Sequence, residues 1–165
     1  MPGLVQRLSV AGAVLLAFGC AAATSGGGTA GTEYRKDLGN VTPHDFSLHG
    51  RRLLERYHYE MEQVDSSATY QQLKTRWYKR YPYDDELVMG VVEIETQITL
   101  RARSRGGAAG GSGDLRSAEL IAQNMARMKG SSESVLTVMS PMFKEYIDEI
   151  ARELKTEFST GIRVF

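Results

Sequence analysis

Three arginines stand at alternate positions at the end of the segment VVEIETQITLRARSR, where their spacing suits the binding of an anion. In a β-strand, Arg101, Arg103 and Arg105 lie on one face, about 7 Å apart at each step. Guanidinium groups this close repel one another unless carboxylates, solvent or an anionic ligand offset their charge, and their forked donors match phosphate groups. We therefore expect nearby carboxylates at this face, or an anionic component such as the phosphates of lipid or lipopolysaccharide.

A second cationic segment, KTRWYKRYPY, interleaves basic and aromatic residues. Such a segment stacks nucleic-acid bases in some proteins, but the same pattern arises in a core strand whose outer positions are charged. We expect the second arrangement and no nucleic-acid partner. The surface that we predict for an anion or a partner draws on both segments and comprises Arg76, Tyr78, Arg80, Arg101, Arg103 and Arg105.

Catalytic, cofactor and metal motifs are not recognisable in this sequence. The glycines at 106–113 lack the strand-to-helix context and the Lys-Ser/Thr ending of a phosphate loop. His44, His49 and His58 do not form an i,i+4 pair of zinc ligands. The acidic run Asp84–Glu86 lies in YPYDDE, which is typical of a solvated turn. We therefore predict a protein that is not an enzyme and holds no cofactor or metal.

The only cysteine of the chain, Cys20, stands at the end of its only long apolar run. A short segment ending in Arg7 precedes the apolar residues 8–18, which are fewer than the ~20 that cross a bilayer. A basic start, a short apolar core and small residues after it are the pattern of a secretory signal peptide. An exported protein with one unpaired thiol needs a reason to keep it.

The sequence AFGC, which ends at Cys20, resembles the lipobox of bacterial lipoproteins. In that family a dedicated peptidase cuts before a cysteine that receives lipid. Gly19 fits the position before the cut, whereas Ala17 and Phe18 differ from the usual Leu followed by Ala or Ser. The resemblance implies a signal peptide over 1–19 and lipid attachment at Cys20.

The segment after the cysteine, AAATSGGGTAGT, contains no apolar residue large enough to build a core. We predict a flexible lipidated tether over 20–40 and a single globular domain over 41–165. A lipid and a tether anchor a protein to a membrane without spanning it. Because Ala21 and not Asp follows the cysteine, the resemblance implies the outer membrane, with the domain facing the periplasm. The alternative is a soluble exported protein cut after 21–23, without Cys20.

A first helix is predicted over 43–55. Thr42 suits the N-cap, Pro43 the first helical position, and Asp45 the exposed amides of the first turn. Gly50 inside this helix costs about 1 kcal/mol relative to Ala, which a close approach to another element would explain.

Three further segments alternate apolar and polar residues with a period of two, which indicates antiparallel strands: RYHYEMEQV, TYQQLKTRWYKRY and VVEIETQITLRARSR. We expect the apolar faces of all three strands on one side of the sheet, with Val92 among the inward residues. This requirement fixes the register of both hairpins and sets Lys74 opposite Glu60 in the first and opposite Glu95 in the second. The segment 115–129 fits either a helix or a strand, and the glycine-rich loop before it favours a fourth strand.

A long C-terminal helix is the clearest element. Ser140 suits the N-cap, Pro141 the first position, and Gly161 the end. One apolar stripe runs along it: Phe143, Ile147, Ile150, Leu154 and Phe158. The predicted fold is therefore α+β and two-layered, with an N-terminal helix, a three- to four-stranded antiparallel sheet, and this helix packed on one face. The element order resembles the helix-grip-like domains of small accessory lipoproteins in outer-membrane assembly.

The chain has 20 basic and 20 acidic residues, so no charge excess favours nucleic acid or an acidic membrane as a whole-protein partner. We expect a non-enzymatic envelope lipoprotein that acts as an accessory or interaction module, with another envelope protein as its partner. The alternative is a periplasmic carrier or sensor that holds an apolar or anionic lipid between the sheet and the C-terminal helix. The sequence leaves the oligomeric state open.

Overall fold

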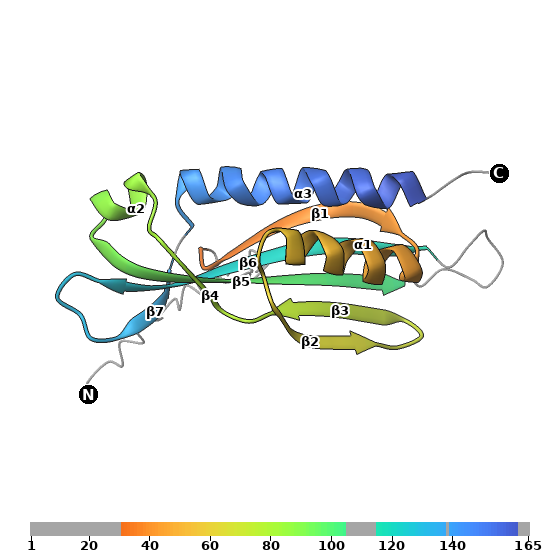
Figure 1. Ribbon diagram of the computed structural model, residues 1–165, viewed down its shortest axis with the longest axis horizontal. Helices are drawn as coiled ribbons and strands as arrows, with labels where there is room; N and C mark the ends of the chain where they lie inside the picture. The colour runs from red at the N-terminus through yellow and green to blue at the C-terminus, as the bar shows by residue number, and fades with distance from the viewer. Residues whose placement is uncertain (1–30, 105–114, 138, 162–165) are drawn as a thin grey trace, which may run out of the picture.

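The computed structural model describes residues 31–104, 115–137 and 139–161, and within them seven strands form one antiparallel sheet (Figure 1). In chain order the elements are β1 (Glu33–Val41), α1 (Pro43–Arg56), β2 (Met61–Ser66), β3 (Tyr70–Thr75), β4 (Tyr78–Arg80), α2 (Asp84–Val88), β5 (Val91–Ser104), β6 (Arg116–Met128), β7 (Ser134–Thr137) and α3 (Pro141–Gly161). The strand order is β1-β6-β5-β3-β2, while β4 pairs with β5 and β7 pairs with β6. The predicted α+β class is confirmed, but the sheet has more strands than the three or four expected.

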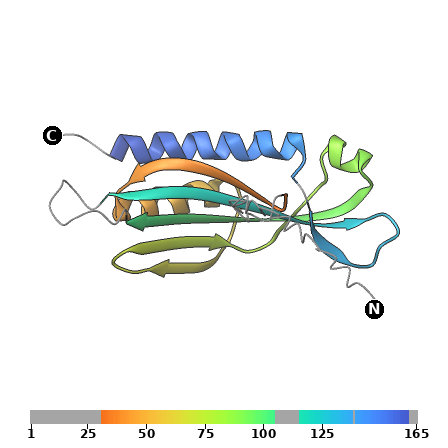
Figure 2. The ribbon, with the colours of Figure 1, turned by 180° about the vertical axis from the view of Figure 1, so that it is seen from behind.

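The long strands β5 and β6 form the central ribbon of the sheet, and each has an outer edge divided between two shorter strands. Along β6, β1 pairs with the first part and β7 with the last part. Along β5, β4 pairs with the first part and β3 with the last. Seen from behind, β7 and α2 lie at the same end of this ribbon (Figure 2).

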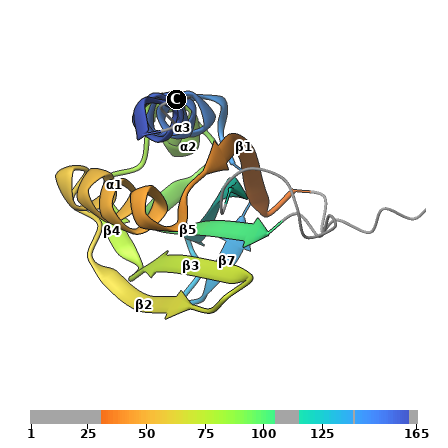
Figure 3. The same cartoon turned by 90° about the vertical axis from the view of Figure 1, so that its right-hand side faces the viewer.

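The helices α1 and α3 lie on the same side of the sheet (Figure 3). As predicted, Ser140 caps α3, because its Oγ accepts the N–H of Phe143 at 3.2 Å. The predicted stripe of α3 is confirmed, and its five members are fully buried: Phe143, Ile147, Ile150, Leu154 and Phe158. The rings of Phe158 and Phe46, from α3 and α1, lie 6.1 Å apart. The two helices and the inner face of the sheet thus share one core.

The start of α1 also agrees with the prediction: the side-chain oxygen of Thr42 accepts the N–H of Asp45 at 3.1 Å. Gly50 is buried where α1 crosses the sheet. A Cβ on Gly50 would lie 3.0 Å from Cδ1 of Leu73 and 3.1 Å from Cδ1 of Leu100. The close approach inferred from this glycine is therefore confirmed, and the space has no room for a branched side chain.

Gly50→Val is expected to lower the free energy of unfolding by about 1–3 kcal/mol, because overpacking forces neighbouring side chains off their rotamers. Urea denaturation measures the change. Arg52→Gly and Arg52→Val, at an exposed position of the same helix, supply the control for the difference in helix propensity between glycine and valine. A Gly50→Val protein as stable as the wild type would show that the contact with the sheet does not constrain this position.

The predicted boundary between tether and domain was wrong. The tether was expected over 20–40, but Glu33–Val41 forms the strand β1 of the sheet. Its sequence, EYRKDLGNV, is mostly polar, and only Leu38 and Val41 are buried. The register of β1 shifts between Asp37 and Gly39, where Gly39 has a φ of 83°. This irregularity interrupts the alternation that identifies a strand in a sequence.

The expected strand RYHYEMEQV begins later than predicted. The helix α1 continues to Arg56, Tyr57 is its C-cap, and His58 follows with a φ of 65°. This left-handed residue turns the chain, so the strand begins only at Met61. The apolar residues that suggested period two are therefore divided between a helix end and a strand.

The predicted register of the sheet was wrong: Lys74 pairs with Gln63 and Thr99 instead of Glu60 and Glu95. The turn between β2 and β3 sets the first register, because it places Ser66 opposite Gln71 and the pairs run regularly from there to Lys74. The connection from β4 to β5 contains α2 instead of a tight turn, so Lys79 and not Lys74 lies opposite Glu95. The segment 115–129, left between helix and strand by its sequence, is the strand β6.

Candidate functional site

Arg101 and Arg103 lie on the face of the sheet opposite α1 and α3, as their alternation with the buried Ala102 requires. They line a shallow pocket of about 260 Å³ together with Arg35 and Glu119. No helix covers this face in the described part of the chain (Figure 3). The predicted Arg105 lies outside the described residues. Two of the three predicted arginines are therefore together on an open surface.

The two arginines have neutral neighbours on β3. Nε of Arg101 donates to Oε1 of Gln72 at 3.1 Å. The guanidinium of Arg103 lies 5.8 Å from the ring centre of Tyr70. Among the described carboxylates, none forms an ion pair with either arginine, so both retain donors for an incoming anion.

The third guanidinium of the pocket, that of Arg35, was missed because its strand was assigned to the tether. Arg35 forms ion pairs with Glu33 at 2.6 Å and with Glu119 at 3.5 Å. The hydrogen bond to Glu33 and the charges of both carboxylates raise the pKa of Arg35. Both carboxylates thus form ion pairs with Arg35, whereas Arg101 forms none within 4.0 Å with any described carboxylate, not even with Glu119, which lies opposite it in the β5–β6 pair. No signal in the sequence places Arg35 beside these arginines without the strand pairing.

The segment KTRWYKRYPY does not extend this surface. Arg76 is exposed after β3, with a guanidinium nitrogen 4.0 Å from a carboxylate oxygen of Glu60. Tyr78 packs edge-on against Tyr59, with ring centres 5.3 Å apart. The five described residues of the predicted surface are thus divided among separate parts of the molecule.

Arg80 does not belong to the predicted surface, because its side chain is only 9% exposed. Two of its guanidinium nitrogens bind the two carboxylate oxygens of Glu86, each at 2.7 Å. Glu86 itself is 2% exposed and lies in the short helix α2. The expectation of a solvated turn over Asp84–Glu86 was therefore wrong for its last member. A forked pair of this kind allows two opposite charges to be buried together.

Aromatic and polar groups surround the guanidinium of Arg80. It lies 4.6 Å from the ring centre of Tyr83 and 4.5 Å from that of Phe143. Its Nε donates to Oγ1 of Thr96 at 3.1 Å, and that hydroxyl donates to Oδ1 of Asn124 at 2.7 Å. The network therefore links β4, β5 and β6 through buried side chains.

The carboxylate of Glu86 extends the same network to α3. Its Oε2 accepts the backbone N–H of Tyr83 at 2.8 Å, and its Oε1 accepts the hydroxyl of Ser140 at 3.3 Å. Next to it, Asp85 accepts the N–H of Met142 at 2.9 Å. The helix α2 is thus fixed to the first turn of α3, which gives this network a structural role.

Four tyrosines near α1 and α3 have raised pKa values. Burial raises the pKa of Tyr59, Tyr83 and Tyr146. Burial and a hydrogen bond to Glu153 raise the pKa of Tyr57 to about 12. These phenols therefore stay protonated to a higher pH than free tyrosine does.

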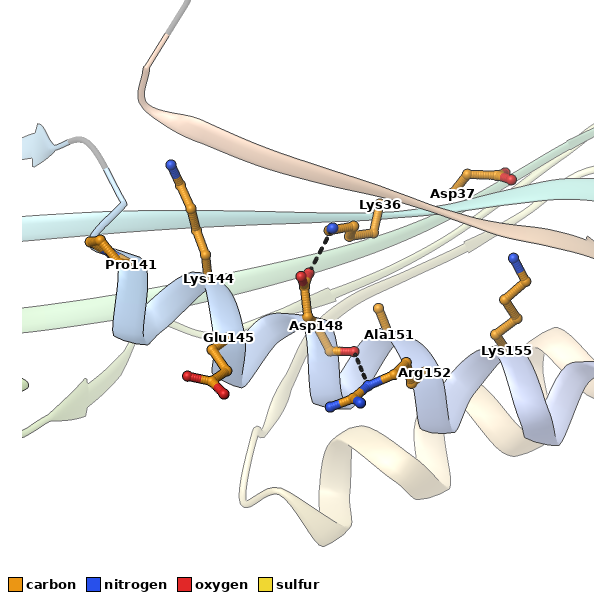
Figure 4. A pocket seen from close by; sticks show the side chains of 9 residues that line it. All are labelled: Lys36, Asp37, Pro141, Lys144, Glu145, Asp148, Ala151, Arg152 and Lys155. Carbon is orange, nitrogen blue, oxygen red and sulfur yellow. Dashed lines mark hydrogen bonds and ion pairs between the residues drawn. The ribbon is translucent and has the colours of Figure 1, made fainter.

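A groove of about 730 Å³ runs between β1 and α3 and was not predicted (Figure 4). Asp148 lies at its centre and binds Nζ of Lys36 and the hydroxyl of Tyr34, each at 2.9 Å. Lys144 and Lys155 point from α3 toward β1 on either side of Asp148 (Figure 4). The groove thus combines four cationic side chains with three carboxylates, since Arg152, Asp37 and Glu145 also line it.

The histidines are separated. His49 lies 3.2 Å from a carboxylate oxygen of Glu157, while His44 and His58 are exposed elsewhere. In the residues described, no three His, Cys, Asp or Glu side chains are grouped to hold a metal ion. None of the helices in the described ranges is long and apolar enough to cross a bilayer. The chain matches no known family model, and no curated protein is significantly similar to it in sequence.

Proposed function

We propose that this protein is a non-enzymatic lipoprotein of the bacterial cell envelope, anchored through lipid on Cys20, whose domain is an accessory or interaction module. The observation that carries the proposal is the position of the only cysteine at the end of the only long apolar run. The first strand begins at Glu33, so only residues 21–32 separate the lipid site from the sheet. The module is held close to the membrane, and we place it at the outer membrane, facing the periplasm.

Expression of the full chain in a bacterium with two membranes tests the anchor. The N-terminal peptide is expected to begin at Cys20 and to carry the mass of two or three acyl chains. Cys20→Ser is expected to remove the lipid and release the protein from the membrane fraction, because the proposal assigns the membrane attachment to that lipid. Ser25→Ala, in the same segment, is the control. An unmodified N-terminus near Thr24 would contradict the proposal.

The pocket of Arg101 and Arg103 is the surface that we propose for an anionic group of an envelope partner. Both guanidiniums are on the open face of the sheet, and neither forms an ion pair within 4.0 Å with a described carboxylate. Arginine is suited to such contacts because it presents several donors in one plane. An acidic protein surface or a phosphorylated saccharide fits this chemistry.

Arg101→Gln/Arg103→Gln is expected to weaken binding of the soluble, phosphorylated saccharide part of lipopolysaccharide by about tenfold or more. Hydrogen bonds to charged groups contribute about 1.5–3 kcal/mol each, and about 1.4 kcal/mol corresponds to tenfold. Calorimetric titration at two salt concentrations measures the loss. Arg76→Gln, outside this pocket, should bind as the wild type does. Equal affinities for all three proteins would remove this surface from the proposal.

The second candidate is a carrier or sensor of an anionic lipid, favoured by the groove between β1 and α3. Lys144 and Lys155 face this groove, and their ammonium groups suit a phosphate headgroup (Figure 4). An apolar ligand beneath α3 has less support. The space between α3 and the sheet is filled by fully buried side chains such as Ile147 and Ile150.

A further inference from the structure

Most of the large apolar side chains that are exposed in the described residues gather at one end of the molecule. We define the apolar tip as Leu87, Val88, Met89, Val92, Val135 and Leu136. These residues belong to α2 and its C-cap, the start of β5, and β7. Both α2 and β7 project at the same end in opposite views (Figures 1 and 2). Val88 is 89% exposed, so the tip presents apolar surface that nothing in the described chain covers.

The backbone of the tip is fixed, which distinguishes it from a loose loop. The ion pair of Glu86 with Arg80 holds α2 to β4, and the bond from Met142 to Asp85 holds it to α3. On the other side, β7 pairs with β6 in a regular hairpin. A surface held in this way loses little conformational freedom when it docks.

The path of the chain indicates what lies next to the tip. Glu33, the first residue of β1, pairs with Gln123 of β6. Thr137, the last residue of β7, pairs with the neighbouring Asn124 on the same edge. The segment that leads back to Cys20 therefore joins the domain beside β7.

The length of that segment brings the membrane within reach of the tip. The twelve residues 21–32 can reach at most about 40 Å. From Gln123 to the end of β6 at Met128 is about 17 Å at the rise of a strand. The tip therefore lies within reach of a bilayer that holds a lipid on Cys20.

We propose that the apolar tip rests in the interfacial layer of the bilayer to which Cys20 is anchored; this inference depends on the proposed lipid anchor. Exposed charges of both signs border the tip, among them Lys129, Glu133 and Asp84. The tip therefore needs no anionic lipid, and burial of its apolar side chains supplies the attraction. Two contacts, lipid and tip, fix the orientation of the domain on the membrane.

A fluorescent probe on the full chain tests this orientation. Val88→Cys and Ser67→Cys place an environment-sensitive probe on the tip and, as a matched control, on the exposed β2–β3 turn at the opposite end (Figure 1). The proteins are reconstituted in phosphatidylcholine vesicles that contain lipids with a quencher in the acyl chain. The probe at position 88 should shift to shorter wavelength and lose most of its intensity, while the probe at position 67 stays unchanged. Leu87→Glu/Leu136→Glu should abolish the shift.

Equal behaviour of the two probes would overturn the inference, and so would protection of position 88 only by an added envelope protein. The mass of the N-terminal peptide, measured on the same preparation, separates this result from failure of the anchor. If Cys20 is acylated but the probe at position 88 reports water, the lipid anchor is supported and the docking of the tip is disproved. If Cys20 is unmodified, the anchor fails, and the same probes in a Cys20→Ser background decide whether the tip enters the bilayer alone.

Discussion

Arg80→Met is expected to lower the free energy of unfolding by about 3–5 kcal/mol, because it leaves one member of a buried ion pair without its partner. Glu86 would lose two hydrogen bonds of 2.7 Å in a position where it is 2% exposed. Methionine has enough length to occupy the slot between Tyr83 and Phe143. The cost therefore arises from the lost charge more than from a cavity. Urea denaturation followed by circular dichroism measures it.

Two further variants separate the buried charge from other causes. Arg80→Met/Glu86→Leu is expected to recover much of the lost stability, since replacing both members with apolar side chains removes the uncompensated charge. Arg76→Met provides the surface control, because that arginine side chain is 69% exposed and lies 4.0 Å from Glu60. Its effect should stay within about 1 kcal/mol. If Arg80→Met cost no more than Arg76→Met, the network would not hold α2 in place.

Phe158→Ala is expected to cost about 3–5 kcal/mol, the range for deleting a fully buried phenylalanine. Phe158 lies in the last turns of α3 and has no exposed surface. Its ring packs on Phe46 and ends 3.9 Å from where a Cβ of Gly50 would stand. The space cannot close easily, because α1 already approaches the sheet closely at Gly50.

Met142→Ala is the control for this variant, since Met142 is an exposed apolar residue of the same helix. It should change the free energy of unfolding by about 0.5 kcal/mol or less. Thermal denaturation of both variants at one pH gives the comparison. Equal stability of the two variants would mean that the end of α3 contributes nothing to the core.

The helices α1 and α3 were predictable because their signals are local. Ser140, Pro141 and an apolar stripe place α3 without any knowledge of its neighbours, and Thr42 does the same for α1. The inward face of β5 also follows from its alternation, apart from Val92. That residue is exposed because the register of β5 shifts between Val91 and Glu93.

The strand β1 and the sheet register depend on contacts far apart in the chain. The polar sequence EYRKDLGNV forms a strand because β6 supplies its hydrogen-bond partners, and β6 lies more than seventy residues later. The error at Lys74 arises from the two connections, since the β2–β3 turn places Ser66 opposite Gln71 and the β4–β5 connection contains α2.

The burial of Arg80 and Glu86 could not be predicted from the sequence for a different reason. Each residue alone has the composition of a surface, and only their mutual hydrogen bonds make burial favourable. A turn between them was predicted, but its helical form and its contact with Ser140 arise from packing against α3. The candidate pocket was likewise half predicted: Arg101 and Arg103 follow from alternation, whereas Arg35 joins them through β1.

The length of β5 sets how far the arginine pocket stands from the apolar tip. One strand carries Val92 of the apolar tip near its start and Arg103 of the arginine pocket near its end, about 35 Å away at the rise of a strand. The paired strand β6 stiffens this span along nearly its whole length. With the tip on the bilayer, the central ribbon works as a rigid spacer that lifts the arginines beyond the headgroups. A partner would then be selected partly by how far its own acidic surface stands from the membrane.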